Sequence, residues 1–383
     1  MTEGTLPGTV AALQARGVRR VHLLAWRDLD DADAGGSELH AHELMRRWAA
    51  HGLEVTTRTS SAAGLPSRTT RDGYRVVRKG SRYTSFHRTV GPELTRSMGR
   101  YDALVEVWNG VPFLSPIWCR KPRLTVLHHV HGPMWDQLFS PRVARIGRVM
   151  ETKLAPPFYR SGTLVCPSES TRQELLALGF RPDRVIAVAN GTPDWYRPGA
   201  ARAARPLVLA VGRLAPVKRF DSLVHAVATA RTEVPDVELV IVGIGPERAN
   251  IEAAIDAVDG RDWVSLPGRV SSADLLRLYQ EAWVVSSASL AEGWGLSLTE
   301  GAACATPAVA TDISGHQSSV VDGVTGLLAP LDGLDVALTK VLIDPELRHR
   351  LGTAALARAR ALSWDRTVES ITAQLLAVTE RHR

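Results

Sequence analysis

The feature that most constrains the fold is an alternation of short apolar runs with segments of helical period. The run at 21–25 is followed by an acidic loop, by Gly35 and Gly36, and by apolar residues at helical spacing between Ala41 and Ala49. Strands that alternate with helices predict a parallel, doubly wound α/β sheet. Further runs of buried-strand type lie at 53–57, 103–107, 124–127 and 164–166, and later at 207–211, 237–242, 264–266, 283–285 and 308–310.

The alternation is interrupted between 190 and 204 by a stretch rich in Asn, Gly and Pro, which is typical of a linker. A chain of 383 residues also exceeds what one hydrophobic core usually supports. We therefore expect two Rossmann-like domains, over 1–195 and 205–362, and over 363–383 a helix whose apolar side needs a partner. Two such domains facing one another would leave a ligand cleft at the carboxyl ends of their strands.

The compartment is indicated by two absences and by the cysteines. No apolar run approaches the roughly 18 residues of a membrane-spanning helix, and the first residues do not form a charged-then-apolar leader. Cys119, Cys166 and Cys304 are odd in number and far apart, which favours buried thiols in a reducing compartment. We therefore expect a cytoplasmic protein without a nucleic-acid partner.

The net charge of +6 is carried mainly by arginine, and the densest basic stretch has Asp72 as almost its only acid. Such a stretch could meet anionic lipid at the inner membrane face or an acidic acceptor. A solvated face in an arginine-rich protein is the more common case. The cations of the stretch are Arg68, Arg71, Arg75, Arg78, Lys79, Arg82 and Arg88.

The strongest chemical signal lies between 286 and 330. Glu292 and Glu300 are eight residues apart, with Gly293 and Gly295 between them where a loop turns into a helix near Ser297. Glycine permits close backbone approach, and a helix N-terminus offers unpaired amides to an anion such as a diphosphate. The two carboxylates are then placed for two hydroxyl-bearing parts of one ligand, a ribose and a hexose. Alternatively, both merely complement the positive end of the helix.

Two cations, Arg213 and Lys218, follow the strand at 207–211. Arginine offers a fork to phosphate oxygens and lysine a compact charge, so the pair would suit a departing diphosphate. The alternative is two surface charges before a helix. In the first half, the Gly35-Gly36 turn also precedes a helix and could approach donor phosphates from the opposite side.

Three histidines, His128, His129 and His131, follow the strand at 124–127, and we expect at least one to contact substrate. A metal site is less expected, because no matching carboxylate pattern accompanies them and His40 and His42 are spaced to face apart. Core packing is the remaining alternative.

Other nucleotide and hydrolase motifs fail. The glycines after the strand at 237–242 begin a dinucleotide fingerprint, but Arg248 occupies the third glycine position. The chain has no Gly-x-Ser-x-Gly elbow and no Walker lysine loop, so serine hydrolase and P-loop kinase are poor interpretations.

Taken together, these residues resemble family 4 of the retaining glycosyltransferases, which share the GT-B fold. The resemblance covers nearly the whole chain. It rests on the Glu292-x7-Glu300 motif, which begins with EGWGL, and on the segment from Gly212 to Lys218, Asn190-Gly191, Gly323 to Leu328, and Gly35-Gly36.

The resemblance implies that 1–195 binds the acceptor, that 205–362 binds a nucleotide sugar, and that the terminal helix crosses back to the first domain. Glu300 would hold the donor ribose and Glu292 the transferred sugar. His131 would contact the sugar near the reacting carbon, with His129 as the alternative. The diphosphate would be held by Arg213, Lys218 and the amides of Trp294, Gly295 and Leu296.

Family members need neither a metal nor a cofactor beyond the nucleotide-sugar donor, here a GDP- or UDP-linked mannose or glucose. The acceptor would be a sugar, a lipid-linked molecule or a small molecule. Retention would proceed without an enzymic nucleophile, the leaving phosphate taking the acceptor proton. The sequence departs from the family pattern at Ser314-Gly315, where two glycines are common, at Ser318, where an acid is common, and at Gly301, where alanine is usual.

Two alternatives remain open at this point. One is a GT-B enzyme of another reaction class, a nucleotide-sugar epimerase or a glycan phosphorylase. The other is a noncatalytic nucleotide-sugar-binding subunit that activates a partner.

Overall fold

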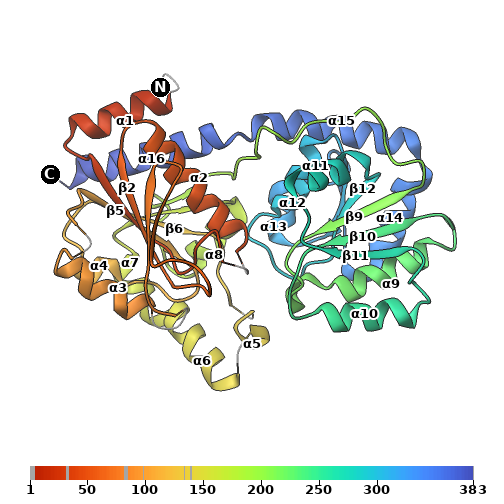
Figure 1. Ribbon diagram of the computed structural model, residues 1–383, viewed down its shortest axis with the longest axis horizontal. Coiled ribbons are helices and arrows are strands. Elements are labelled where there is room, and N and C mark those ends of the chain that lie inside the picture. Colours follow the sequence, from red (N-terminus) through yellow and green to blue (C-terminus); the bar gives the residue numbers. More distant parts are fainter. Residues whose placement is uncertain are drawn as a thin grey trace. The chain divides into compact units, whose positions relative to one another are not determined.

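The computed structural model describes residues 5–31, 34–81, 85–97, 99–132, 134–138 and 140–382. Contacts divide the chain into two units: unit 1 contains the residues up to Gly191 and those from Trp364 onward, and unit 2 is Thr192–Ser363. Each unit is built on its own sheet, as the two-domain α/β prediction requires (Figure 1).

Unit 1 contains an eight-stranded sheet in the order β3-β4-β2-β1-β5-β6-β7-β8. All neighbours pair in parallel except β3 and β4, which form an antiparallel hairpin at one edge. The five strands expected from apolar runs are present; β3, β4 and β8 were not predicted. The strands are β1 (Arg20–Leu24), β2 (Glu54–Thr59), β3 (Arg68–Arg71), β4 (Tyr74–Arg78), β5 (Ala103–Trp108), β6 (Arg123–Leu127), β7 (Thr163–Cys166) and β8 (Val185–Ala187).

The helical segments of unit 1 connect these strands and cover the sheet. They are α1 (Leu6–Ala15), α2 (Gly36–Ala50), α3 (Ser85–Leu94), α4 (Ser115–Trp118), α5 (Met134–Leu138), α6 (Pro141–Val149), the π-helical η1 (Met150–Leu154), α7 (Pro156–Tyr159), α8 (Glu169–Ala177) and α16 (Trp364–Arg381).

The last helix, α16, packs on unit 1, although unit 2 precedes it in the sequence. It contacts α1, α2 and β6, and lies beside α1 in Figure 1. Its apolar side, Val368, Ile371 and Leu375, is fully buried in the core of this unit. Burial of each such side chain contributes about 1.5–3 kcal/mol. The apolar side of the terminal helix therefore has the partner that the sequence requires.

Unit 2 contains a six-stranded parallel sheet in the order β11-β10-β9-β12-β13-β14. This is the doubly wound order in which the connection reverses direction between the first and fourth strands, here β9 and β12. All but β14 match predicted runs. The strands are β9 (Leu207–Val211), β10 (Glu238–Val242), β11 (Val264–Gly268), β12 (Val284–Ser287), β13 (Ala308–Thr311) and β14 (Gly326–Ala329).

The helices of unit 2 follow these strands in turn. They are η2 (Pro216–Lys218), α9 (Phe220–Ala230), α10 (Arg248–Ala257), α11 (Ser272–Glu281), α12 (Leu296–Ala303), α13 (Ser314–Ser319), η3 (Leu331–Gly333), α14 (Leu334–Ile343) and α15 (Pro345–Ala361). Cys119, Cys166 and Cys304 are buried and unpaired with one another, as expected. Among the helices in the described ranges, none is long and apolar enough to cross a membrane.

Candidate functional site

The core of the candidate site is an ion pair at the reversal point of the sheet in unit 2. Lys218 follows β9 and Glu292 follows β12, and these two strands are neighbours. Lys218 Nζ pairs with Glu292 Oε1, and the hydroxyl of Ser289 donates to the same oxygen at 2.9 Å. The structure thus brings together two residues that the sequence selected 74 positions apart. Ligands of open α/β sheets bind at this reversal point.

Glu292 is held as a carboxylate. Burial pushes its pKa upward, but the charges of Lys218 and His316 and the hydrogen bonds from Lys218 and Ser289 hold the pKa below its usual value. Its side chain remains 18% exposed and that of Lys218 remains 22% exposed. Glu292 is therefore ionised, and both side chains are within reach of a ligand.

The loop that carries Lys218 is fixed by the loop after β10. The amide of Gly212 donates to Val242 O at 3.0 Å and that of Leu214 to Ile244 O at 2.9 Å. Added Cβ atoms would lie 1.9 Å from Gly212 O at Gly243 and 2.2 Å from Leu214 O at Gly245. These glycines, which begin the incomplete dinucleotide motif, therefore serve close packing of two loops. Arg213, which follows Gly212 in the loop that carries Lys218, is exposed.

The EGWGL segment ends in the N-terminus of α12. Gly295 is the N-cap, with φ +86°, and a Cβ there would lie 3.2 Å from both His316 Cδ2 and Ser319 Oγ. Only glycine combines that backbone angle with that space. Trp294 is buried, and α12 begins at Leu296. The helix start that we expected near Ser297 is thus present, with its first amides next to Glu292 in the chain.

Glu300 lies just over one turn into α12, in a different environment. The hydroxyl of Tyr279 donates to Glu300 Oε2 at 2.6 Å, and Tyr196 also donates to this carboxyl group. Burial raises the pKa of Glu300 to about 7, although both tyrosines act to lower it. A cation holds Glu292 ionised, whereas Glu300 titrates close to neutral pH. The two glutamates are therefore suited to different parts of a ligand.

Short helix α13 supports the Glu292 loop from the other side. A Cβ on Gly315 would lie 2.1 Å from the carbonyl oxygen of Glu292. His316 is fully buried, with Nδ1 2.8 Å from Thr311 O, while the Thr311 hydroxyl donates to Ser289 O at 2.5 Å. His316, Thr311 and Ser289 were not selected from the sequence, because nothing in their spacing marks them as neighbours of Glu292.

Two of the three departures from the family pattern have local explanations. Gly315 must be a glycine because of the Glu292 carbonyl, whereas Ser314 is partly exposed and tolerates a side chain. A Cβ on Gly301 would lie 2.6 Å from Val285 Cγ2, so glycine there accommodates the valine of β12. Both changes preserve the packing around α12.

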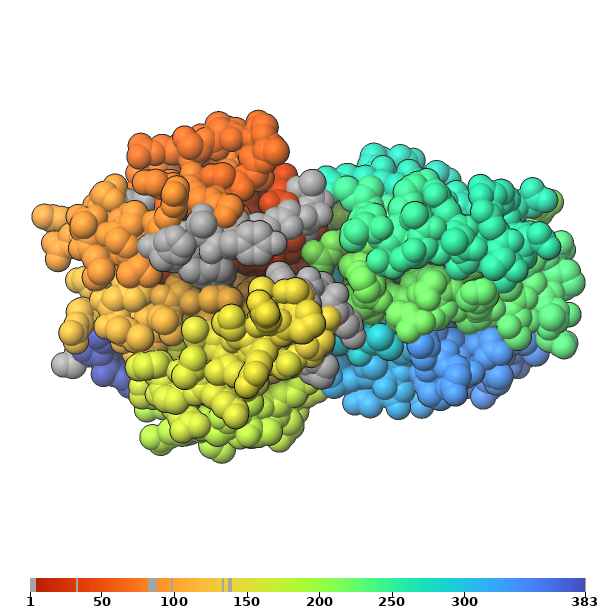
Figure 2. Space-filling model, turned by 90° about the horizontal axis from the view of Figure 1, so that it is seen from below, coloured from red at the N-terminus to blue at the C-terminus, as the bar shows by residue number. Residues whose placement is uncertain are grey.

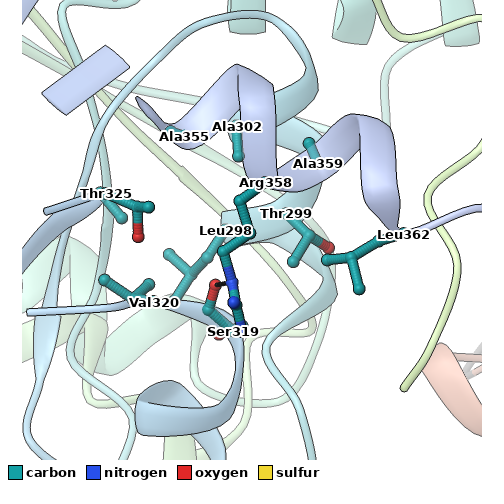
Figure 3. A pocket seen from close by; sticks show the side chains of 11 residues that line it. Leu298, Thr299, Ala302, Ser319, Val320, Thr325, Ala355, Arg358, Ala359 and Leu362 are labelled. Carbon is teal, nitrogen blue, oxygen red and sulfur yellow. Dashed lines mark hydrogen bonds between the residues drawn. The ribbon is translucent and has the colours of Figure 1, made fainter. Parts of the chain in front are cut away.

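A small pocket lies between α12, the end of α13 and α15 (Figure 3). Its lining includes Leu298, Val320 and Arg358, and it contains none of the predicted catalytic or donor-binding residues. Arg358 Nη2 donates to Ser318 O at 2.7 Å, so this side chain fastens the end of α13 to α15. The pocket therefore lies among the residues that hold α12 and α13 in place, and not among the predicted ligand-binding residues.

In unit 1, His131 is held by a carboxylate that the sequence did not single out. Glu151, 1% exposed, accepts from His131 N at 2.9 Å and lies 3.1 Å from His131 Nδ1 with the same oxygen, Oε1. Its other oxygen accepts from Gly132 N at 3.1 Å and from Trp135 Nε1 at 3.0 Å. Burial would raise the pKa of Glu151, but these hydrogen bonds, with His131 foremost, lower it.

This arrangement fixes the His131 ring. Because Glu151 is ionised, Nδ1 of His131 must carry the proton, which leaves Nε2 as the nitrogen that can accept from or donate to a ligand. The indole of Trp135 fits against Gly110 and Gly147, where Cβ atoms would lie 3.1 Å and 2.4 Å from its ring. Glu151 lies on the π-helical turn η1, a feature often found at functional sites.

Of the other two histidines of the cluster, His128 is buried, whereas His129 is partly exposed, as His131 is. His128 is 8% exposed, and its ring is 4.8 Å from that of His40. Burial, and to a lesser extent the neighbouring His129, lowers the pKa of His128 to about 3, so the ring is neutral. Within the described ranges, no group of three or more histidine, cysteine or acidic residues could hold a metal ion.

The Gly35-Gly36 turn begins α2 as predicted, with Gly35 as N-cap. The amide of Gly35 donates to Glu38 Oε2 at 2.7 Å, and Arg27 Nε donates to the other oxygen of Glu38 at 3.2 Å. This amide is therefore used by the helix's own carboxylate. Asn109 Nδ2, after β5, donates to Ser37 Oγ at 3.4 Å, which links the turn to the neighbouring strand.

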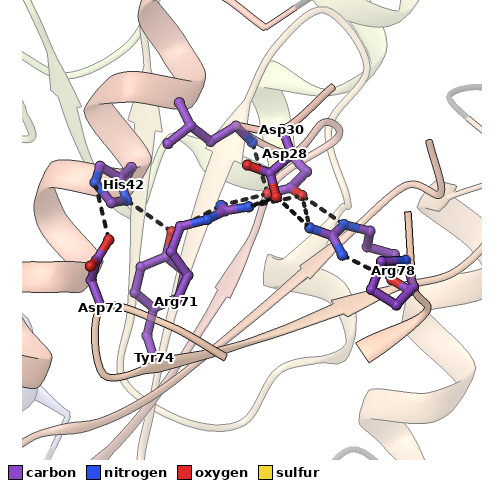
Figure 4. A network of polar contacts seen from close by, with 9 residues as sticks. Asp28, Asp30, His42, Arg71, Asp72, Tyr74 and Arg78 are labelled. Atoms are coloured by element: carbon purple, nitrogen blue, oxygen red, sulfur yellow. Dashed lines mark hydrogen bonds and ion pairs between the residues drawn. The ribbon is translucent and has the colours of Figure 1, made fainter. Parts of the chain in front are cut away.

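Two aspartates in the loop before that turn form ion pairs with two arginines of the basic stretch (Figure 4). Asp28 accepts from Arg71 Nη1 at 2.9 Å and from Arg78 Nε at 2.6 Å, and Asp30 pairs with both arginines. The side chain of Arg78 is 1% exposed. The acids that balance the stretch thus come from a loop more than 40 positions away. Arg68, Lys79 and Arg88 are exposed, Arg75 pairs with Glu54 at 3.0 Å, and Arg82 lies outside the described residues.

Family models match both halves of the chain. The Glycosyltransferase Family 4 model matches residues 34–194, and the model of glycosyl transferases group 1 matches residues 193–358. The D-inositol 3-phosphate glycosyltransferase of Kribbella flavida is 29% identical, over 91% of this chain and 92% of that protein. The enzyme of the same name from Gordonia bronchialis is 27% identical, over 97% and 89%.

Solved structures of other proteins share this fold. Sucrose-phosphate synthase from Thermosynechococcus elongatus superposes with a TM-score of 0.77 at 22% identity, over 92% of this chain and 97% of that one. WaaG, a glycosyltransferase of lipopolysaccharide biosynthesis, superposes with a TM-score of 0.74 at 17% identity, over 92% and 98%. With both halves matched, relatives aligned over nine-tenths of the chain and the fold in agreement, the chain belongs to the GT-B glycosyltransferases of the family 4 type.

Proposed function

We propose that this glycosyltransferase moves a hexose of the mannose or glucose type from a GDP- or UDP-sugar to a small acceptor, with retention of configuration and without a metal. The observation that supports this most directly is the Lys218–Glu292 pair at the reversal point of the sheet, adjacent to the N-terminus of α12. A cation, a helix start and a carboxylate in one place suit a diphosphate joined to a sugar. HepE from Anabaena, with a TM-score of 0.72, is described in complex with UDP-glucose.

The diphosphate would replace Glu292 as the ionic partner of Lys218. Without ligand, the lysine charge is balanced by Glu292. An arriving diphosphate is a stronger anionic partner, and Arg213 together with the amides of Trp294, Gly295 and Leu296 would complete its site. Glu292, released from the lysine, can then accept hydrogen bonds from sugar hydroxyl groups. Coupling of the two events would make donor binding and sugar recognition one step.

Glu300 would hold the ribose. A carboxyl group that accepts from two tyrosine hydroxyls keeps lone pairs for a further donor, and a ribose hydroxyl is such a donor. His131 of unit 1 would contact the sugar near its reacting carbon through Nε2, the nitrogen that Glu151 leaves available.

Transfer would break the bond between the anomeric carbon and the diphosphate oxygen and form one from that carbon to the acceptor oxygen. The acceptor proton would pass to a leaving phosphate oxygen on the same face of the sugar. Lys218, Arg213 and the helix start would stabilise the charge that develops on the diphosphate. No metal is needed in this scheme, because these groups supply the positive field.

The first acceptor to test is D-inositol 3-phosphate, the acceptor in the names of the relatives that align over most of the chain. Other phosphorylated polyols and simple sugars belong in the same panel.

The test is release of nucleoside diphosphate from a panel of UDP-, GDP- and ADP-sugars in the presence of EDTA, with and without acceptor. We expect one donor to be turned over by the wild type and not by Glu300→Ala or Lys218→Ala. Lys340→Ala, an exposed lysine on α14, is the matched control and should behave as wild type. Loss of activity in EDTA that Mg²⁺ restores would contradict metal independence. Conversion of the donor to an epimer, or binding without turnover of any donor, would favour the alternative functions.

A further inference from the structure

The helical segment from α6 through η1 to α7 carries a row of exposed apolar side chains. Their exposed fractions are 46% for Val143, 67% for Ile146, 53% for Leu154 and 48% for Phe158. Steps of three, eight and four residues keep them along one side of a helix, and the partly exposed Met150 stands between. The backbone remains helical across the joins, with φ −60° at Met150 and φ −75° at Ala155. Single exposed apolar residues are ordinary, but a continuous row is not.

The side of the segment that attaches it to unit 1 lies roughly a quarter turn around the helix from this row. Ala144, Gly147, Glu151 and Ala155 are buried there, and Gly147 lies against the Trp135 ring. Small residues bring this side close to the protein, while the larger apolar residues occupy the neighbouring, exposed side. The exposed row is therefore distinct from the side that packs on unit 1.

Cations accompany the row. Between 140 and 160 the chain has five arginines and lysines and a single acid, Glu151, which is buried beneath. Arg142, Arg145, Lys153 and Arg160 are exposed, whereas Arg148 pairs with Asp136. The α6 helix lies at the surface on the face of unit 1 seen in Figure 2, where it is coloured yellow. The outer surface of this segment is thus both apolar and cationic.

We propose that this surface docks on an anionic lipid bilayer. A helix with apolar residues on one side and arginine and lysine beside them lies in the interface, with its apolar row among the acyl chains and its cations at phosphate head groups. The long arginine and lysine side chains reach from the row to the head groups. The basic stretch at 68–88 is a weaker candidate, because Arg71 and Arg78 are engaged with Asp28 and Asp30. The proposal does not depend on which sugar is transferred.

The experiment is co-sedimentation of the purified full chain with vesicles of phosphatidylcholine and phosphatidylglycerol in equal parts, compared with phosphatidylcholine alone. We expect binding to the anionic vesicles, little binding to the neutral ones, and weakening as salt is raised. Ile146→Glu should weaken binding about tenfold or more, because it places a like charge in the apolar row. Val336→Glu on α14 is its matched control, since Val336 is exposed to 69%, and should bind as wild type.

A second pair of variants compares the two cationic surfaces. Arg142→Glu with Arg145→Glu should also weaken binding about tenfold or more, and Arg68→Glu with Lys79→Glu should have little effect. The proposal is overturned if the wild type ignores anionic vesicles, if Ile146→Glu binds as well as Val336→Glu, or if the 68/79 pair alone abolishes binding. It is also overturned if sedimentation equilibrium shows a dimer that Ile146→Glu dissociates, because a second copy would then cover the row. All variants change exposed residues, and thermal unfolding checks that they fold.

Discussion

Glu151 of unit 1 and Glu292 of unit 2 each lie beside a predicted catalytic side chain, but they differ in how fully their oxygens are occupied. Glu151 is 1% exposed, and four N–H groups are shared between its two oxygens. Glu292 is 18% exposed, and its hydrogen bonds within the described part of the chain, from Lys218 and Ser289, are both made by Oε1. A carboxylate whose two oxygens both accept hydrogen bonds from the protein, here called saturated, stabilises the fold. A carboxylate with one oxygen not used in this way can bind a ligand.

The comparison extends to Asp28, which resembles Glu151. It accepts from Leu29 N at 2.8 Å and from Arg71 and Arg78, and it is 5% exposed. Substitution of a saturated carboxylate should therefore cost stability first, and substitution of Glu292 should cost activity first. Four measurements test this distinction.

The largest effect should come from Glu292→Gln, which keeps the shape and removes the charge. We expect kcat/KM to fall about 10²–10³-fold, because a group aimed at the transferred sugar is lost. The free energy of unfolding should change by less than about 1 kcal/mol, since the ion pair is partly exposed. Steady-state kinetics and denaturant unfolding measure the two. The control is Glu281→Gln, at a glutamate paired with Arg277, and it should change neither quantity. A loss of stability with normal kinetics would show that Glu292 has a structural role like that of Glu151.

Asp28→Asn should lower the free energy of unfolding by about 3 kcal/mol, because it leaves the buried Arg78 with only the partly exposed Asp30 as a charge partner. The exposed pair of Asp183 with Arg181 offers the control, and Asp183→Asn should cost less than about 1 kcal/mol. The pKa of Asp28 is lowered by Arg71 and Arg78 against the effect of burial. Its stabilisation is therefore present above the unfolded pKa of about 4 and is lost as pH falls through the folded pKa. Denaturant unfolding along a pH series should show this acid loss in the wild type and less of it in the variant.

Glu151→Gln should cost about 1–3 kcal/mol, because the new amide turns a donor toward N–H groups that need an acceptor. It should also reduce kcat by altering the His131 ring and its pH profile. Combination with His131→Asn separates the two effects: the kinetic effect of Glu151→Gln should vanish in that background, whereas part of the stability loss should persist through Gly132 and Trp135. Equal kinetic effects with and without His131 would show that Glu151 does not act through that ring.

The smallest effect should be the pH dependence that Glu300 confers. Burial raises its pKa to about 7. The folded chain therefore holds a proton that the unfolded chain releases near pH 4.5, and stability falls as pH rises from about 4.5 through about 7. Glu300→Gln should flatten the unfolding free energy across this window. An unchanged pH profile in the variant would assign the titration to another group.

Much of unit 2 could be predicted because the residues that determine its structure lie close together in the sequence. The carboxylates of Glu292 and Glu300 share one loop and helix, and the doubly wound order places the Lys218 loop beside them once β9 and β12 are recognised. The same alternation predicts most strands, since each is a buried apolar run. It misses β3 and β4 because their arginines and threonines do not form such a run.

The rest depends on side chains that meet only after folding. Glu151 joins His131 across 20 positions, and Asp28 joins Arg78 across 50. The periodic pattern of apolar residues along the sequence predicts neither of these pairings. A signal for Glu151 was nonetheless present: it is the single acid between 140 and 160, and at helical spacing it shares one side with the small residues Ala144, Gly147 and Ala155.

The position of α16 has a consequence for synthesis. Unit 2 is contiguous from Thr192 to Ser363 and can fold as soon as its own residues leave the ribosome. Unit 1 cannot close its core until Val368, Ile371 and Leu375 have been translated, although most of it is made first. The order of completion is thus reversed relative to the order of translation. The nascent first half must wait with an open apolar surface, and a stop codon shortly after residue 363 would damage the half of the protein that was made earliest.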